Sequence, residues 1–186
     1  MSRIAIFFAE GYEEIEGLTV VDICRRAGLT IDMVSVTGKQ VVPGSHGIAV
    51  TMDKLYEEVD ISTYDMLVLP GGKVGVEGLE AHEALMEQVD AFYKAGKYVA
   101  AICAAPSILG HRGILQGKKA CSYPSFEGHL TGATVTAGPV EIAGNVITSR
   151  GMGTSIDFAL AIVGELLGAE RAKELADTIV YRGGLA

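Results

Sequence analysis

The stretch from Tyr98 to Gly110, YVAAICAAPSILG, places one cysteine where a thiol could act as a nucleophile. The small apolar residues before Cys103 predict a buried strand, and Pro106 is typical of the first turn of a helix, where a missing amide costs nothing. The pattern A-x-C-x-A supplies the small flanking side chains that a sharp strand-to-helix turn needs. At the start of a helix the dipole favours the thiolate, so we expect a lowered pKa for Cys103. The alternative is a cysteine buried as a small hydrophobic residue.

Glu16 is the acid most suited to work with such a thiol. Apolar residues follow it at four, seven and eleven positions, so a helix here would turn this carboxyl toward the core. Burial raises the pKa of a carboxyl group, and a protonated Glu16 could donate a hydrogen bond to a thiolate at Cys103. If the apolar stripe is rotated, Glu16 belongs instead to a solvated first turn. For Glu13 and Glu14 we expect that solvated position.

A glycine pair, Gly71-Gly72, follows the apolar run DMLVLP. Backbone amides that converge at a strand end suit an oxyanion hole, and we assign Gly71, Gly72 and Ala104 to such an anion pocket. The alternatives are a phosphate-binding loop, because Lys73 lies in PGGKVG, and a plain turn. The stretch matches neither common nucleotide-binding pattern, so nucleotide binding is weakly supported.

A cysteine nucleophile usually works with a histidine base, and no histidine follows Cys103. Tyr123 can donate a hydrogen bond but is a poor base near neutral pH. We interpret His111 and His129 as surface histidines.

Composition limits the possible partners and compartment. The chain has 186 residues and a net charge of −8, without a large basic cluster, so we expect neither nucleic-acid nor membrane binding. No apolar run is long enough to span a membrane and no signal peptide is recognisable, which predicts a cytoplasmic protein. The scattered histidines predict no metal site, and the three cysteines predict no disulfide framework. We leave open that Cys121 resolves an oxidised Cys103 as a disulfide.

Strands and helices alternate along the chain. We expect strands at 3–8, 30–36, 65–69, 99–102, 119–122, 134–135 and 145–148, a hairpin within 38–50, and helices at 13–27, 81–95, after Thr154 and at 170–180. Thr154 and Asp157 form a predicted capping box, and Gly168 ends that helix. This order predicts one α/β domain over 1–186, a three-layer sandwich with a mostly parallel sheet. Ligands of such sheets bind at the carboxyl ends of the strands, where the candidate residues fall.

Five motifs together resemble the DJ-1/PfpI superfamily, in particular its ThiJ-like and parkinsonism-associated deglycase branch. They are YEEIE at 12–16, VDICRRAG at 21–28, LPGG at 69–72, AAICAAP at 100–106 and SRGMGTSIDFAL at 149–160. The resemblance implies a flavodoxin-like sandwich, a homodimer and no cofactor. It also implies that Cys103 is the nucleophile at a strained elbow, with Glu16 as its protonated partner and the amides of Gly71 and Gly72 in the anion pocket.

The resemblance further implies a stress-response protein that acts on small aldehydes or glycated proteins, of the glyoxalase III or deglycase type. The alternatives are a redox sensor in which Cys103 oxidises to a sulfinate, and a chaperone. Many members carry histidine where this chain has Tyr123, and the protease-like branch has histidine in place of Ala104, so we expect no peptidase. Arg26 matches the family and His46 replaces an arginine; we expect both to line the pocket, with weaker anion affinity.

Overall fold

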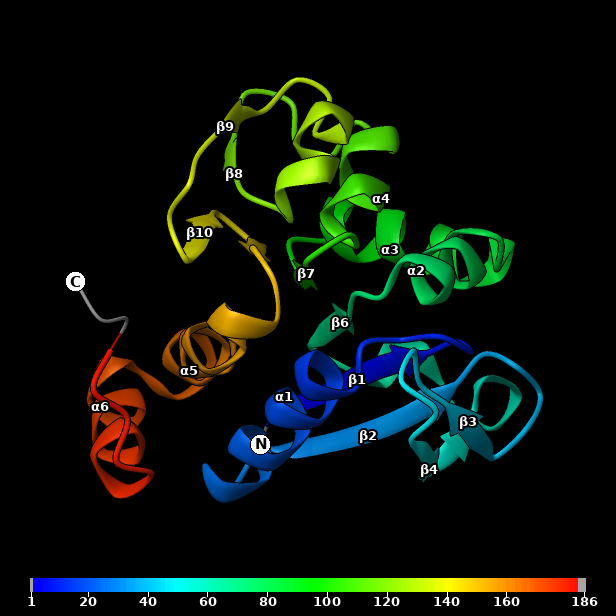
Figure 1. Ribbon diagram of the computed structural model, residues 1–186, viewed down its shortest axis with the longest axis horizontal. Coiled ribbons are helices and arrows are strands. Elements are labelled where there is room, and N and C mark those ends of the chain that lie inside the picture. Colours follow the sequence, from blue (N-terminus) through cyan, green and yellow to red (C-terminus); the bar gives the residue numbers. More distant parts are fainter. Residues whose placement is uncertain (1, 184–186) are drawn as a thin grey trace.

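The computed structural model describes residues 2–183, and a seven-stranded sheet with helices on both faces forms its centre (Figure 1). The strand order is β10-β11-β7-β6-β1-β2-β5, and all pairs are parallel except β10 with β11. The strands of this sheet are β1 (Arg3–Phe8), β2 (Thr30–Ser35), β5 (Lys54–Leu55), β6 (Met66–Leu69), β7 (Tyr98–Ile102), β10 (Val140–Ala143) and β11 (Val146–Ser149). The helices are α1 (Glu14–Arg26), α2 (Lys73–Glu80), α3 (Glu83–Lys94), α4 (Pro106–His111), α5 (Ser155–Leu167) and α6 (Ala169–Thr178).

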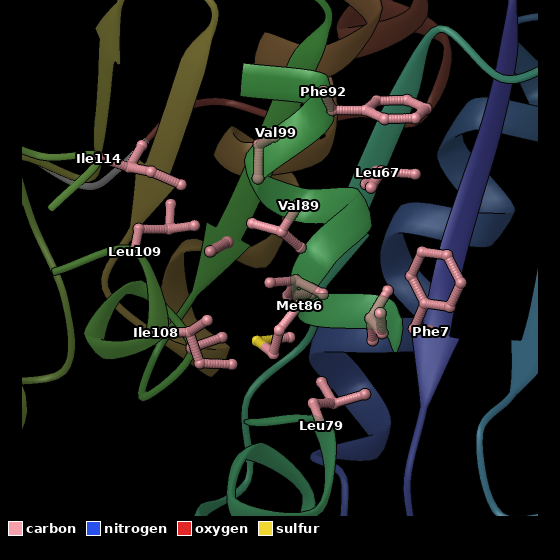
Figure 2. Packing of buried hydrophobic residues seen from close by; sticks show 14 of the residues in the cluster. Phe7, Leu67, Leu79, Met86, Val89, Phe92, Val99, Ile108, Leu109 and Ile114 are labelled. Atoms are coloured by element: carbon pink, nitrogen blue, oxygen red, sulfur yellow. The ribbon is translucent and has the colours of Figure 1, made fainter. Parts of the chain in front are cut away.

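Two apolar clusters fill the space between the sheet and its helices. Along β1, Phe7 belongs to one cluster and Ile6 to the other, because successive strand residues face opposite sides. Helices α2, α3 and α4 cover the first face; Val89 and Phe92 of α3 pack there over the central strands (Figure 2). Helices α1 and α5 cover the second face. The sheet is mostly parallel and helices cover both of its faces, as parallel sheets require. The predicted flavodoxin-like α/β fold is therefore confirmed.

The central parallel strands end at a common edge of the sheet. Ile6 of β1 is paired with Val68 of β6, and Leu69 is paired with Ala101 of β7. The segments that leave these strands therefore start side by side. They lead to α1, to the glycine pair and to Cys103, as the sequence predicted.

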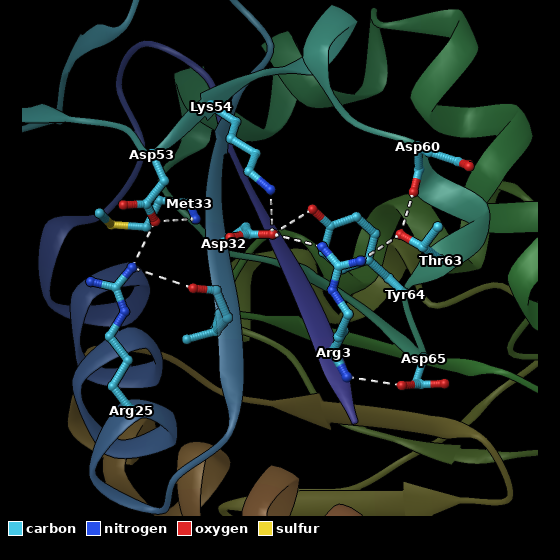
Figure 3. Close-up of polar contacts among 11 residues, drawn as sticks. Arg3, Arg25, Asp32, Met33, Asp53, Lys54, Asp60, Thr63, Tyr64 and Asp65 are labelled. Carbon is cyan, nitrogen blue, oxygen red and sulfur yellow. Dashed lines mark hydrogen bonds and ion pairs between the residues drawn. The ribbon is translucent and has the colours of Figure 1, made fainter. Parts of the chain in front are cut away.

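The opposite edge is tied together by paired charges (Figure 3). Asp32 of β2 accepts hydrogen bonds from Arg3 at 3.3 Å, Lys54 at 3.0 Å and the Tyr64 hydroxyl at 2.6 Å. The backbone amide of Arg3 also donates to Asp65 at 2.8 Å. These contacts join the beginnings of β1 and β6 and leave the carboxyl edge to the site residues.

Several expected elements differ in the structure. The predicted helix 81–95 is α3, but α2 precedes it, because Val76 and Leu79 anchor a helix where PGGKVG was interpreted as a loop. The predicted strand 119–122 is shorter. It is β8 (Lys119–Ala120), which pairs with β9 (Thr134–Val135) in a separate small sheet. The predicted hairpin is confirmed as β3 (Val41–Pro43) and β4 (Ala49–Thr51).

The predicted capping box at the start of α5 is wrong. Thr154 precedes the helix, but its side chain makes no capping hydrogen bond. Its hydroxyl oxygen instead accepts from the amide of Gly151 at 3.1 Å, because Thr154 closes the short 3₁₀ turn η4 (Met152–Thr154). Among residues 2–183, no helix has both the length and the apolar character required to cross a membrane.

Candidate active site

Cys103 lies immediately after β7 in a strained backbone conformation. Its φ angle is 66°, in the left-handed region that residues other than glycine rarely adopt. Two backbone hydrogen bonds hold this conformation: the Cys103 amide donates to the Ser149 carbonyl at 3.0 Å, and the Tyr123 amide donates to the Cys103 carbonyl at 2.8 Å. Pro106 opens α4, as expected. The turn therefore presents the thiol, which is only partly buried, at the carboxyl edge of the sheet.

Glu16 projects from the first turn of α1 into the same place and is only 1% exposed. Its Oε2 accepts a hydrogen bond from the Gly71 amide at 3.0 Å, and the Cys103 thiol is its side-chain hydrogen-bond partner. A Cβ atom added to Gly71 would overlap both Glu16 Oε2 and Cys103 Cβ. Only glycine at position 71 therefore lets the carboxyl group and the thiol meet.

The two acids perturb each other's ionisation. Burial raises the pKa of Glu16 to about 7, although the hydrogen bond from Cys103 opposes this rise. Burial, together with the negative charge of Glu16, raises the pKa of the Cys103 thiol to about 12. The predicted lowering of the Cys103 pKa is wrong, because desolvation outweighs the stabilising amides. Near neutral pH the Cys103 thiol therefore keeps its proton, and Glu16 is about half protonated.

The amides that face the sulfur are those of Gly72 and Ala104, whose hydrogen bonds favour the thiolate. The Gly71 amide is occupied by Glu16, so Gly71 positions the acid and does not belong to the anion pocket. Gly72 adopts a φ angle of 89°, and an added Cβ would overlap the carbonyl oxygen of Gly11. These two amides can thus stabilise a negative charge that develops on sulfur or on an atom bound to it.

A pocket of about 340 Å³ opens over the thiol. Tyr123 and His46 line it, as predicted. Its other lining residues are Glu13, Glu16, Ser45, Gly72, Lys73, Cys103, Ala104, Phe126 and Met152. Of the residues that the prediction missed, Lys73 had a signal in the sequence, since it directly follows the glycine pair. Phe126 and Met152 had none, because their segments reach the pocket only in the folded chain.

Arg26 does not line this pocket, which corrects the prediction. It lies at the far end of α1 from Glu16, about 15 Å along the helix axis at 1.5 Å per residue. Its side chain forms an exposed ion pair with Asp22 at 2.7 Å and borders a different hollow.

Glu14 is buried, although the sequence predicted a solvated position; its exposed fraction is 3%. The His46 amide donates to its Oε1 at 2.7 Å, and His46 Nδ1 lies 2.9 Å from its Oε2. Burial opposes ionisation, but hydrogen bonds from His46 and from the Ile48 amide lower the pKa of Glu14 to about 2. Ligand atoms of Glu13, Glu14 and His46 lie within 4.8 Å of one another, close enough to share a cation.

Cys121 does not have the properties of a resolving cysteine. It is fully buried, and its sulfur donates a hydrogen bond to the Thr148 carbonyl at 3.4 Å. Burial raises the pKa of its thiol. An accessible thiol of low pKa is what resolution of a sulfenate requires, and Cys121 is neither accessible nor acidic.

Comparison with known proteins places this geometry in a family. The model of the DJ-1/PfpI family matches residues 2–165. The chain is 37% identical over 182 residues to protein DJ-1 homolog B of Arabidopsis thaliana, covering 97% of this chain and 42% of that protein. It is 34% identical to the Parkinson disease protein 7 homolog of Danio rerio, covering 97% of each, and 32% identical to a deglycase of Pyrococcus abyssi, covering 80% of this chain and 89% of the relative. The chain thus spans less than half of the Arabidopsis relative.

Solved structures agree with the sequence comparisons. Oxidized DJ-1 of Toxoplasma gondii superposes with a TM-score of 0.94 at 34% identity, covering 98% of this chain and all of the other. DJ-1beta of Drosophila melanogaster superposes with a TM-score of 0.91 at 33% identity, covering 97% and 98%. With the family model matched over most of its length, the chain belongs to the DJ-1/PfpI family.

Proposed function

We propose that the protein is a cofactor-independent, cysteine-dependent enzyme of the stress response that acts on small reactive carbonyl compounds, in the manner of a glyoxalase III or a deglycase. The observation that carries this proposal is the position of the partly exposed Cys103 thiol, which contacts the buried Glu16 carboxyl and the amides of Gly72 and Ala104. The strained backbone of Cys103, with a φ angle of 66°, holds the thiol there. The deglycase relative in Pyrococcus abyssi supports this substrate class.

The first step uses the ionised form of Glu16, which makes up about half of the molecules near pH 7. Glu16 takes the proton from the Cys103 thiol while sulfur attacks the aldehyde carbon, so that a C–S bond forms and the carbonyl electron pair moves to oxygen. The resulting oxyanion is stabilised by the amides of Gly72 and Ala104. A pKa of about 7 suits Glu16 to this role, because it can accept and return a proton near neutral pH.

With methylglyoxal the reaction then proceeds without an external oxidant. Glu16 first returns the thiol proton to the oxyanion, which gives a hemithioacetal and leaves the carboxylate able to act as a base. It then moves a proton from the former aldehyde carbon to the neighbouring ketone carbon, while the hydroxyl proton passes to the ketone oxygen, so that the first carbon is oxidised and the second reduced. The product on sulfur is a lactoyl thioester. Water cleaves the thioester, which releases lactate and restores the thiol.

The test is lactate formation from methylglyoxal by the purified protein. We expect Cys103→Ser to reduce the rate to the background and Glu16→Gln to reduce it about 100-fold or more, since general acid–base groups contribute 10²–10⁴. Cys121→Ser is the matched control, because it removes a buried thiol outside the pocket, and it should retain the rate. Equal rates in the wild type and in Cys103→Ser would overturn the proposal.

A second candidate function is a redox sensor. A proton on Glu16 would lie beside the sulfur and could bind a sulfinate, and the Gly72 and Ala104 amides would bind its charge. Each step consumes one peroxide: an S–O bond forms, the O–O bond breaks and water leaves. Intact-mass measurement after mild peroxide tests this; the sensor requires two added oxygen atoms on Cys103, lost in Cys103→Ser. A chain that gains no oxygen at Cys103 excludes it.

We also propose a homodimer in the cytoplasm. The outer face of α1 borders an apolar hollow of about 630 Å³, with Ile15 49% and Ile48 55% exposed. Contiguous exposed apolar surface marks protein contacts, and a second copy of the chain would cover it. Light scattering should give twice the chain mass, and Ile15→Glu with Ile48→Lys should give the monomer. A monomeric wild type at micromolar concentration would contradict this assignment.

A further inference from the structure

A second hollow, of about 430 Å³, shares Lys73 and Phe126 with the Cys103 pocket but contains different chemistry. Three helices end at it: Glu80 is the last residue of α2, His111 of α4, and His129 of the 3₁₀ helix η3 (Pro124–His129). The sequence predicted ordinary surface positions for both histidines. In the structure the two imidazoles and the carboxylate form one connected group.

The three side chains are joined in series. His111 Nδ1 lies 2.6 Å from Glu80 Oε1, and His111 Nε2 lies 3.0 Å from His129 Nδ1. A carboxylate can only accept, so Nδ1 of His111 carries the hydrogen and Nε2 presents its lone pair. A carboxylate that fixes the tautomer of an imidazole in this way is the usual outer partner of a metal-bound histidine.

The approach of the two histidines is built into the backbone. A Cβ atom added to Gly110 would overlap the carbonyl oxygen of His129. Glycine at position 110 therefore lets η3 lie against α4, directly beside His111. The amide of Thr131 donates to the same carbonyl at 2.9 Å and holds it there. Packing of the main chain thus brings the two exposed histidines side by side at the surface.

The separation of the two hydrogen-bonded nitrogens sets the angle at an ion that both would bind once His129 has changed tautomer and the rings have turned their lone pairs toward the ion. Metal–nitrogen bonds of about 2.0–2.1 Å to nitrogens 3.0 Å apart subtend an angle of about 95° at the ion. A tetrahedral site needs about 109° and thus a wider separation, whereas square-planar and octahedral sites place neighbouring ligands near 90°. Among divalent ions that prefer tetragonal nitrogen ligation, Cu²⁺ binds most tightly.

We propose that His111 Nε2 and His129 Nδ1 bind a divalent copper ion, with Glu80 as the positioning residue that orients His111. The hollow leaves the remaining positions of the ion open to water or a small anionic ligand. Binding requires His129 to move its proton from Nδ1 to Nε2, which changes the tautomer but not the charge. This site is independent of the carbonyl chemistry proposed for Cys103.

The test is copper titration of the full-length Cys103→Ser protein, in which the accessible thiol no longer competes; the other two cysteines are buried. Electron paramagnetic resonance with one equivalent of Cu²⁺ should show a tetragonal signal split by two nitrogens, and calorimetry should give one ion per chain. His111→Gln and His129→Gln should each lower the affinity at least 100-fold and remove one nitrogen. Glu80→Gln should lower it 10- to 100-fold with both nitrogens retained.

The matched control is His46→Gln, which removes an exposed histidine from the Glu13, Glu14 and His46 group and should leave the affinity and the signal unchanged. A signal split by a single nitrogen that disappears in His46→Gln would assign the ion to that group, which has one imidazole, and would overturn the proposal. Undiminished binding in the double variant of His111 and His129 would also overturn it. Thermal melting of each metal-free variant separates these results from loss of folding.

Discussion

Two glutamates on the first turn of α1 show how differently the same fold can treat the same side chain. Glu14 and Glu16 are two residues apart and are 3% and 1% exposed. The side chain of His46 and the backbone amides of Glu14, His46 and Ile48 donate to the Glu14 carboxylate and lower its pKa to about 2. Glu16 has one amide and a thiol, and burial raises its pKa to about 7. Glu16 also lies deeper among other atoms than Glu14, so the depth of burial and the donors that reach each carboxylate together separate the two pKa values.

The two acids must therefore affect stability in opposite pH ranges. The lowered pKa of Glu14 stabilises the fold above the ordinary value of 4.5, and this contribution is lost as the pH falls toward 2. The raised pKa of Glu16 stabilises the fold below 4.5, and this contribution is lost as the pH rises through 7. At neutral pH, Glu14 therefore makes its full contribution to the free energy of unfolding, whereas Glu16 has lost part of its contribution.

The largest expected effect comes from the glycines that cover the two acids. In Gly71→Ala the new methyl group overlaps both Glu16 and the Cβ of Cys103, which the strained turn holds in place. We expect loss of the Cys103-dependent rate and destabilisation of about 1–3 kcal/mol, which is typical of overpacking. In Gly44→Ala the overlap is with the Glu14 side chain alone, so the loss of stability should be smaller and the chemistry retained.

Urea unfolding and the methylglyoxal assay measure these two effects. Gly128→Ala is the control, since its added methyl group meets no atom within 4 Å. If Gly44→Ala abolished the rate and Gly71→Ala did not, the assignment of the two regions would be reversed.

An intermediate effect is expected from the acids themselves. Glu14→Ala leaves the amides of His46 and Ile48 without their acceptor and should destabilise the protein by about 1–3 kcal/mol at pH 7. The difference from the wild type should shrink as the pH falls below 4.5. Glu16→Gln should be at least as stable as the wild type above pH 7, because it removes a buried charge, and should lose this advantage below pH 4.5. Unfolding free energies from pH 8 to pH 3 check both slopes; slopes of equal sign would refute the comparison.

The smallest effect is expected from His46. Its hydrogen bond to Glu14 raises the pKa of this exposed imidazole above 6.5. A raised pKa stabilises the fold below the ordinary value, and the contribution disappears as the pH rises through the raised pKa. We therefore expect His46→Gln to lower the melting temperature at pH 6 by less than Glu14→Ala does, with little difference at high pH. A lowering that grows with pH would show that His46 does not act through Glu14.

Much of the fold and part of the candidate site could be predicted from local sequence. Runs such as RIAIFF and YVAAI are apolar on both faces, which predicts buried parallel strands, and the structure confirms them as β1 and β7. The apolar spacing after Glu16 predicted a buried carboxyl group, and small residues around Cys103 predicted the sharp turn. The helix α2 was missed because glycines at positions 71, 72 and 75 are typical of a loop. Burial of Val76 and Leu79 in the core, which the local sequence does not show, stabilises the helix.

The pKa values could not be predicted in the same way. The sequence indicates that Cys103 begins a helix, which favours the thiolate, but it does not indicate how much solvent the surrounding chain removes. Glu14 shows the same limit: apart from its own amide, the donors that lower its pKa come from positions 46 and 48 of the hairpin segment, more than thirty residues away. The predicted role of Arg26 was wrong for a related reason, since a helix carries residues ten positions apart to opposite ends.

By itself, the sequence determined most of the strands and helices of the sandwich, the strand-end position of Cys103 and the inward face of Glu16, because each depends on neighbours within a few helical or strand turns. Only the tertiary structure decided which amide faces which acid, that Gly71 holds Glu16 while Gly72 faces the thiol, and that His111 and His129 meet. These contacts join segments far apart in the chain, and the free energy of burying a charge depends on every group that surrounds it in space.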